Sequence, residues 1–486
     1  MKRTISATLL LSLLLAASMT ACGNEEKPSS ISDSAAPETT QEITTVVDPK
    51  AGLPKADFEG ETFTVLAGIE AWQTDYVAEE TGDILNDAVY ARNIAVEEMY
   101  NIKLVYDVKN GYTAGTAEMS KALQNSVMAG DVTYDLLLAC TAYTGTYIMQ
   151  GVLSDLNQKE HLDFTDAWWY HNVISEMSVG EKLYIASGGA AINALSSAWG
   201  IFFNKEILNS LQLDNPYALV NEGKWTLDAF KKMASTAYSD LNGNGVHDGG
   251  DRFGFVYQQK EPFDIFPYAM GRTITKLDAD GIPQLTGVSE RIIGIMDSMS
   301  ELIKEKEYCF STSKLDLSEL IPIFSAEQAL FITYPIRIVR SAEMREAPDF
   351  GILPMPKYDE AQDQYYNQCF MDIMAIPALV KNDEMSQLVM NALNCVSYYD
   401  VLPMYKETVL QRKLSRDDDS AEMIDIIIAG AALDFGTLYY QQIEQNLFFS
   451  SNITSNQSYA TWWAANESKC QKKLEDLITK ISELEN

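Results

Sequence analysis

The chain has 486 residues and a formal net charge of −33 at pH 7. Such an acidic surface argues against a nucleic-acid partner, because it would repel a phosphate backbone. Hydrophobic residues make up 47% and charged residues 22% of the chain, a composition that excludes a fibrous or wholly disordered protein. The length of the chain suffices for two or three domains.

The N-terminus has the pattern of a lipoprotein signal peptide. Lys2 and Arg3 form a positive start, and residues 5–17 are an apolar run too short to span a bilayer well. Cys22 then follows small and apolar residues, which resembles the lipobox in which a cysteine receives a diacylglyceryl group. We predict a signal peptide at residues 1–21 and a lipid on Cys22 that holds the protein at the outer face of the cytoplasmic membrane. An ordinary cleaved signal with an incidental cysteine is the alternative.

The next segment, residues 22–57, is rich in Ser, Thr, Pro and Glu and has too few apolar side chains to form a core. We expect a disordered tether between the lipid and the folded region. No later run reaches about 18 consecutive apolar residues, so acyl chains are the only membrane attachment that the sequence predicts.

The cysteines match no zinc-site spacing and contain no CxxC pair. If Cys22 is lipidated, five remain, and at least one of them is unpaired. We expect most to be buried thiols and leave a single disulfide open. The five are Cys140, Cys309, Cys369, Cys395 and Cys470.

The folded region opens with alternating strand and helix patterns. Apolar periodicity predicts strands at residues 61–68, 102–106 and 134–139, separated by helices at 81–100 and 117–129. This order predicts a parallel sheet covered by helices, an α/β fold. Ligands of such sheets bind at the carboxyl ends of the strands.

Later segments continue the mixed pattern. Thr226 is a predicted N-cap for a helix at residues 227–237. A buried strand is predicted at residues 330–334. A short strand is predicted in residues 350–356, and it runs into a loop that ends in proline. From residue 383 onward the pattern is mainly helical, with a last helix at about 466–484.

Four segments together resemble the family 1 extracellular solute-binding proteins of the maltodextrin-binding type. They are YDLLLACTAYTGTYIMQGVLSDLN from Tyr134, IFFNKEIL from Ile201, KWTLDAF from Lys224 and DFGILPMPKYDE from Asp349. The resemblance implies a periplasmic-binding-protein-like type II fold, with two α/β lobes joined by a multi-strand hinge and a ligand cleft between them. It predicts a first lobe from residues 58–180 and 335–375, and a second lobe from residues 181–334 and 376–486.

The resemblance also implies a function without catalysis. Closure of the hinge around a small solute would present the closed protein to the permease subunits of an ABC importer. The ligand expected is a sugar or oligosaccharide, because an aromatic ring can stack on its apolar face while polar side chains bind its hydroxyls. The protein is expected to act as a monomer.

The candidate ligand-binding residues come from matching this sequence to the family motifs, which places Trp72 and Tyr143 on loops after strands of the first lobe. For each aromatic residue the alternative is core packing; for Arg337 it is a salt bridge, and for Glu261 it is solvation. The candidates are Trp72, Tyr143, Trp199, Glu261, Phe263, Tyr334, Arg337, Asp372, Trp462 and Trp463.

Residues 240–251 have the order of ligands of an EF-hand calcium loop. Oxygen donors stand at positions 1, 3, 5, 9 and 12, a glycine stands at position 6, and position 7 offers its carbonyl. The last donor is Asp where an EF-hand has Glu. We predict a structural Ca²⁺; the alternative is an ion-free turn rich in Asn and Gly. The predicted ligands are Asp240, Asn242, Asn244, Val246, Asp248 and Asp251.

Enzyme classes differ in the sequence motifs that they require. A lipid-anchored glycoside hydrolase is the main alternative, since it needs only two carboxylates at a set separation. A zinc hydrolase is disfavoured, because the three histidines, His161, His171 and His247, form no HExxH motif. We find neither a GxSxG elbow nor a phosphate-binding GxxxxGK[ST] loop. An adhesin or the receptor of a sensor kinase is a third possibility.

Overall fold

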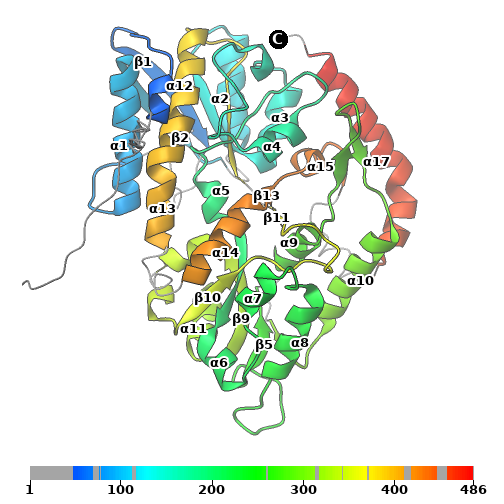
Figure 1. Cartoon of the computed structure of the whole chain (residues 1–486). Coiled ribbons are helices and arrows are strands. Elements are labelled where there is room, and N and C mark those ends of the chain that lie inside the picture. The colour runs from blue at the N-terminus through cyan, green and yellow to red at the C-terminus, as the bar shows by residue number, and fades with distance from the viewer. Residues whose placement is uncertain are drawn as a thin grey trace, which may run out of the picture. The chain divides into compact units, whose positions relative to one another are not determined.

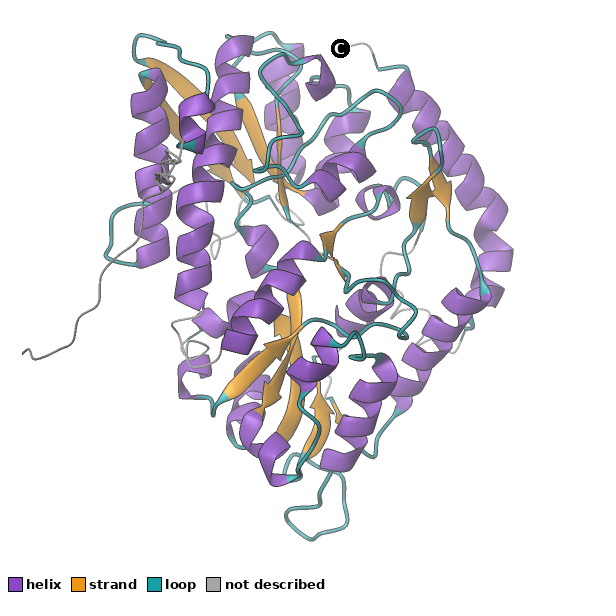
Figure 2. Cartoon of the chain, viewed as in Figure 1, coloured by secondary structure: helices purple, strands orange, loops and turns teal. Residues whose placement is uncertain are grey.

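The computed structural model describes residues 48–68, 76, 78–111, 116–258, 261–311, 317–341, 343–368, 371–409, 418–445 and 457–484. Cys22, Cys369 and Trp72 lie outside these ranges, as do the side chains of Tyr143 and Glu261. All elements below belong to the compact unit Pro49–Asn486. Figures 1 and 2 show its two larger sheets with helices packed around them.

The first sheet has four strands in the order β12-β3-β1-β2. Its three parallel strands and the helices between them confirm the predicted strand–helix alternation. The fourth strand, β12, adds to it in the antiparallel direction. The elements are β1 (Glu61–Gly68), α1 (Ile84–Tyr100), β2 (Ile102–Lys109), α2 (Thr116–Met128), β3 (Leu136–Cys140) and β12 (Asp372–Ala375).

Helix α1 begins three residues later than predicted because of its cap. The carboxylate of Asp83 accepts a hydrogen bond from the N–H of Asn86 at 3.1 Å, which satisfies one of the free donors of the first turn. The helix ends at Asn101, whose φ of 47° is left-handed. This tight ending allows β2 to begin at the next residue.

The second sheet has five strands in the order β10-β4-β9-β5-β8. Strand β4 is buried along its whole length. Its residue Phe202 packs against Phe350 in one core, whereas Ile201 and Phe203 face a second core on the other side. The strands are β4 (Trp199–Asn204), β5 (Phe253–Val256), β8 (Cys309–Phe310), β9 (Ala329–Pro335) and β10 (Phe350–Leu353).

The predicted helix at residues 227–237 is confirmed as α8 (Leu227–Ala237), and the hydroxyl of Thr226 accepts from the N–H of Ala229 at 3.3 Å. Its buried residues recur at helical spacing and form one face. This face lies so close to β5 that a Cβ on Gly254 would stand 1.9 Å from the carbonyl oxygen of Ala234. The other helices of this region are α5 (Asn193–Ser196), α6 (Lys205–Ser210), α7 (Pro216–Asn221), α9 (Glu261–Ala269), α10 (Glu290–Lys304) and α11 (Leu317–Ser325).

The C-terminal part is mainly helical, as predicted. Its last helix, α17 (Tyr459–Ser482), begins seven residues before the predicted start, because Ser458 caps it by accepting from the N–H of Thr461 at 3.2 Å. The remaining helices are α3 (Thr141–Met149), α4 (His171–Met177), α12 (Asp383–Val396), α13 (Leu402–Val409), α14 (Asp418–Ala429) and α15 (Phe435–Leu438). The described residues also contain two small pairs of strands: β6 (Thr275–Leu277) with β7 (Pro283–Leu285), and β11 (Asn367–Gln368) with β13 (Ala431–Ala432).

The chain crosses between the two sheets at points that differ from the predicted lobe boundaries. Strand β10, placed in the first lobe from the sequence, pairs with β4 of the second sheet. Helix α12, placed in the second lobe, packs beside α1 of the first sheet (Figure 1). Apolar periodicity shows that a segment is buried, but not which of two sheets buries it. Below, "first lobe" and "second lobe" mean the four-stranded and the five-stranded sheet with their covering helices.

The four cysteines within the described ranges, Cys140, Cys309, Cys395 and Cys470, are buried, so the expectation of buried thiols is confirmed for them. Burial raises the pKa of the Cys309 thiol far above its usual value, which keeps it protonated and unreactive. Within the described ranges, the helices are all too short or too polar to cross a membrane.

Candidate functional site

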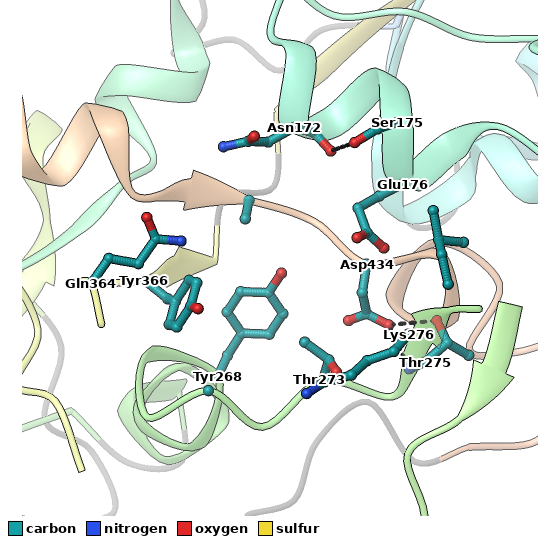
Figure 3. A pocket seen from close by; sticks show the side chains of 13 residues that line it. Asn172, Ser175, Glu176, Tyr268, Thr273, Thr275, Lys276, Gln364, Tyr366 and Asp434 are labelled. Atoms are coloured by element: carbon teal, nitrogen blue, oxygen red, sulfur yellow. Dashed lines mark hydrogen bonds between the residues drawn. The ribbon is translucent and has the colours of Figure 1, made fainter. Parts of the chain in front are cut away.

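A cavity of about 400 Å³ lies among helix α4 of the first lobe, helix α9 of the second lobe and the segments around β6, β11 and β13 (Figure 3). This volume falls within the range of small-molecule sites. Most of the residues around it are polar. They are Asn172, Ser175, Glu176, Tyr268, Gly271, Thr273, Thr275, Lys276, Leu277, Gln364, Tyr366, Ala432 and Asp434.

Helix α4 supplies the first wall because its two faces differ. Val173 and Ile174 are buried in the core together with Met177, which follows them by four and three residues and so lies on the same face. Its other face carries the polar side chains that line the cavity, among them Ser175 and Glu176. The apolar stripe of α4 therefore orients its polar residues toward the cavity.

The opposite wall comes from the end of α9 and the turn into β6. Gly271 has a φ of +85°, a left-handed conformation that favours glycine, and it lies against the ring of Tyr366. After this turn Arg272 points into a separate cluster, where its guanidinium donates to the hydroxyl of Tyr459 at 2.8 Å. Thr273 and Lys276 line the cavity instead.

The carboxylate of Asp434 is fully partnered. It caps α15 and accepts four hydrogen bonds, from the N–H and hydroxyl of Thr275 at 3.0 and 3.1 Å and from the N–H and hydroxyl of Thr437 at 3.2 and 2.6 Å. Only 2% of the residue is exposed. These hydrogen bonds connect β6 to α15, and they satisfy the oxygens of Asp434 with donors from the protein itself.

Glu176 stands in the opposite situation. Its Oε2 is buried and has no hydrogen-bond partner, and the same holds for the hydroxyl of Thr273. The pKa of Glu176 is raised to about 7, chiefly by burial and also by the negative charge of Asp434, while Lys276 opposes the rise. The cavity thus contains two polar atoms that are withdrawn from water and unused by the protein.

Two tyrosines provide aromatic surface. Tyr268 and Tyr366 both line the cavity, as Figure 3 shows. The hydroxyl of Tyr366 donates to Asp363 at 3.0 Å, and burial raises its pKa. Aromatic faces beside hydroxyl, amide and carboxylate groups suit a ligand that has both apolar faces and hydroxyls.

Of the residues predicted from the sequence to bind ligand, none whose side chain the structure describes lines this cavity. Three of them do lie together: the rings of Trp199 and Tyr334 are 5.9 Å apart, and the guanidinium carbon of Arg337 lies 5.6 Å from the centre of the Tyr334 ring. The main chain of Trp199 is held by Asn367, which accepts from its N–H at 3.2 Å and donates to its carbonyl at 2.7 Å.

The other predicted residues are dispersed. Phe263 is fully buried against Tyr257, with ring centres 5.0 Å apart, and has no surface to offer a ligand in this conformation. Asp372 is 1% exposed in β12. Trp462 and Trp463 lie in α17, in an aromatic cluster with Tyr459.

Two of the predicted positions lie at helix starts. Tyr143 was expected on a loop, but β3 leads directly into α3 at Thr141, so Tyr143 is helical. Glu261 is the first residue of α9.

The cavity residues carried little signal in the sequence. Asp434 and Thr437 have the spacing of a helix cap, and α4 has a short amphipathic pattern, but neither feature indicates a ligand. Their four chain segments meet only through the tertiary fold.

The predicted calcium loop connects α8 with β5. Its donors bind one another and the main chain: Asp240 accepts from the N–H of Gly243 and Gly245 at 2.6 and 2.9 Å, and Asp248 accepts from the amide of Asn244 at 2.9 Å. Asp251 differs from these residues. It is completely buried, and its Oδ1 has no partner.

The described residues contain no group of three or more His, Cys, Asp or Glu side chains that could hold a metal ion. A cation in the loop would therefore have to use amide and main-chain oxygens in addition to the aspartates, as calcium does in proteins.

Comparisons with known proteins connect the chain to others by fold. No protein-family model matches it, and no curated protein matches its sequence. A sugar transporter from Rhizobium etli in an open conformation matches with a TM-score of 0.56 and 14% identity, over 87% of this chain and 100% of that one. UspC of M. tuberculosis matches with a TM-score of 0.55 and 15% identity, over 85% and 100%.

The ABC substrate-binding protein Lmo0181 from Listeria monocytogenes, solved in complex with cycloalternan, matches with a TM-score of 0.52 and 13% identity, over 87% of this chain and 98% of that one. At such identities the likeness is one of fold. The predicted fold class, an α/β protein of the periplasmic-binding-protein type II, is confirmed.

Proposed function

We propose that this protein is the extracytoplasmic solute-binding subunit of an ABC importer and captures a sugar or oligosaccharide in the cavity between α4 and β6. The observation that carries the proposal is the cavity itself. It combines the aromatic surface of Tyr268 and Tyr366 with two buried, unpartnered polar atoms, on Glu176 and Thr273. The solved structures with this fold, including a complex with cycloalternan, support the same class of ligand.

The position of the cavity supports capture by closure. Helix α4 packs in the core with the first sheet, whereas α9 packs on the second, with the rings of Phe266 and Phe255 6.1 Å apart. A guest that contacts both walls would stabilise the conformation in which the two lobes lie closest. Permease subunits that recognise this conformation would then receive the solute unchanged.

The same geometry disfavours the glycoside hydrolase. Hydrolysis needs one carboxyl group as acid and a second as nucleophile or base, both free to act. Glu176 has the raised pKa of an acid, but both oxygens of Asp434 are held by four donors. The cavity is therefore better suited to holding a sugar than to cleaving it.

Binding and turnover are measured on the same glycans. The full chain is screened by thermal shift and calorimetry against neutral mono- and oligosaccharides, and each mixture is analysed for cleavage products. We expect saturable binding without products, and about tenfold weaker binding for Tyr366→Ala, because one stacking surface is lost. Tyr90→Ala, at an exposed tyrosine outside the cavity, serves as the control. Cleavage products, or no binding to any glycan, would overturn the proposal.

Attachment to the membrane rests on Cys22, and the proposal places the mature protein on the outer face of the cytoplasmic membrane as a lipid-anchored monomer. The apolar run before this cysteine and the polar segment after it support this location. Replacement Cys22→Ser should move the protein from the membrane fraction to the soluble fraction. A Cys22→Ser protein that stays in the membrane fraction would speak against the lipid.

A second proposal concerns residues 240–251: this loop holds a structural Ca²⁺. The buried, unpartnered Oδ1 of Asp251 stands at the last ligand position of the motif, and an uncompensated carboxylate oxygen there is costly. A cation would relieve this cost and would also draw on the oxygens of Asp240 and Asp248. The partly exposed remainder of the loop leaves room for water as a ligand.

Calcium binding is tested by its effect on the melting temperature. Saturating Ca²⁺ should raise the melting temperature by about 5 °C over the chelated protein, and Mg²⁺ should do so less, because it prefers smaller and stricter geometry. Asp251→Asn should abolish the difference, while Asp214→Asn, at an exposed aspartate, should keep it. Equal melting temperatures with calcium and with chelator would show that the loop is ion-free.

A further inference from the structure

The charges around the cavity are unequal. Glu176 and Asp434 contribute two carboxylates, and Lys276 contributes the one ammonium group among the described residues that line it. Lys276 is exposed, whereas Asp434 is buried and Glu176 is partly buried. Among the groups that line the cavity, carboxylates therefore outnumber the ammonium group, which lies where water can screen it. The buried guanidinium of Arg272 lies outside this lining and interacts electrostatically with Asp434.

The two carboxylates differ in what they can offer a guest. Asp434 receives four hydrogen bonds from Thr275 and Thr437, so its oxygens are occupied. Glu176 has a buried oxygen without a donor. A guest that enters the cavity therefore meets one unsatisfied acceptor that carries charge, and this acceptor requires a donor.

We infer that the site selects neutral and amino sugars over sugars that carry a carboxylate or phosphate group, and that Glu176 is the residue that makes the selection. The inference rests on the proposed function, since it names the class of sugar for the same cavity. A hydroxyl of a neutral sugar satisfies Oε2, and an ammonium group adds a charge-assisted bond. A second anion would be buried beside Glu176 and Asp434, with no buried cation among the described residues that line the cavity.

The probes are three series of sugars with gluco, galacto and manno configuration. Each series contains the neutral sugar, its 2-amino derivative and its uronate, as monosaccharides and as 1,4-linked trimers. Affinities are measured by calorimetry at pH 7.5 with the full chain. Within each series that binds, we expect the amino sugar to bind at least as tightly as the neutral sugar. We expect the uronate to bind more weakly than the neutral sugar, by a factor of about ten or more.

The variant Glu176→Gln keeps the shape of the side chain and removes its charge. It should reduce the preference for the amino sugar about tenfold and improve the uronate, while the neutral sugar changes little, because Gln still offers an acceptor. Glu181→Gln removes the same charge from an exposed residue just beyond α4 and should leave all three affinities unchanged. Circular dichroism and melting curves establish that each variant is folded.

The outcomes separate the two proposals. If neutral sugars bind and uronates bind equally well or better, the inference is wrong while the sugar-binding function stands; loss of that uronate binding in Lys276→Met would assign anion recognition to Lys276. If the order is as expected but Glu176→Gln leaves it unchanged, Glu176 is not the selecting residue. If no sugar of any series binds, the proposed function fails, and the inference fails with it.

Discussion

Glu176 and Asp434 line one cavity and have the same functional group, yet the structure uses them differently. Asp434 lies at the start of a helix, where free N–H groups and two threonine hydroxyls satisfy it. Glu176 lies on the polar face of α4 with one oxygen buried and unpartnered. Neighbouring donors, not residue type, therefore decide which of the two is available to a ligand.

The raised pKa of Glu176 predicts how stability depends on pH in the absence of ligand. Its pKa is about 7 in the folded protein, against 4.5 for an unperturbed glutamate, so the folded protein favours the protonated form. This contribution to stability is complete below the unfolded pKa and is lost as the pH rises through about 7. Glu176→Gln should therefore gain stability over the wild type between pH 5.5 and pH 8, as measured by urea unfolding.

The control for this pH effect is Glu181→Gln, whose difference from the wild type should not change with pH. Asp434 and Lys276 are the charged groups that act on Glu176, and both are retained in the two variants. A Glu176→Gln protein whose stability difference stays constant from pH 5.5 to pH 8 would contradict the assigned burial of this carboxyl group.

At the scale of elements, close contacts between α8 and β5 determine how this helix packs on the sheet of the second lobe. Gly254 in β5 lies against the main chain of Ala234 in α8, with no room for a side chain. The neighbouring Phe255 packs edge to face on Phe230 of the same helix, with ring centres 5.0 Å apart. Glycine at position 254 is thus required by close approach and not by a special φ.

Replacement Gly254→Ala should lower the free energy of unfolding by about 1–3 kcal/mol, because the added Cβ would overlap main-chain atoms that cannot move alone. Chemical denaturation measures this change. Gly52→Ala is the matched control, since nothing lies within 4 Å of a Cβ at that position, and it should be nearly neutral. Equal stability of the two variants would show that α8 and β5 can separate without cost.

At the scale of the whole molecule, one core joins the two lobes. Phe63 of the first sheet and Phe202 and Phe350 of the second belong to the same buried cluster, and residues 49–486 form a single compact unit. Two lobes with a shared core are expected to lose their structure together, even though their sheets are separate.

We therefore predict a single cooperative thermal transition, with a calorimetric enthalpy equal to the van't Hoff enthalpy. A bound sugar should raise the whole transition, because it stabilises only the folded state. Differential scanning calorimetry with and without ligand tests this. Two resolved transitions, of which the sugar moves only one, would mean that the lobes unfold independently.

Much of the fold follows from local patterns. The three parallel strands of the first sheet, the capped helix after Thr226 and the fold class were predicted, because burial periodicity and capping groups act between residues close in the chain. The loop position of Tyr143 and the lobe of β10 were wrong, because helix starts and strand partners depend on distant segments.

Local sequence patterns of this kind did not predict the candidate site. The sequence by itself determined that this chain folds as an α/β protein with alternating strands and helices, since these depend on the order of apolar and polar residues. Only the tertiary structure decided which carboxylate is satisfied and which is left unpartnered, because Glu176, Thr273 and Asp434 come from separate segments that the fold brings to one cavity. Electrostatics and desolvation act through space, so a site of this kind exists only once the chain is folded.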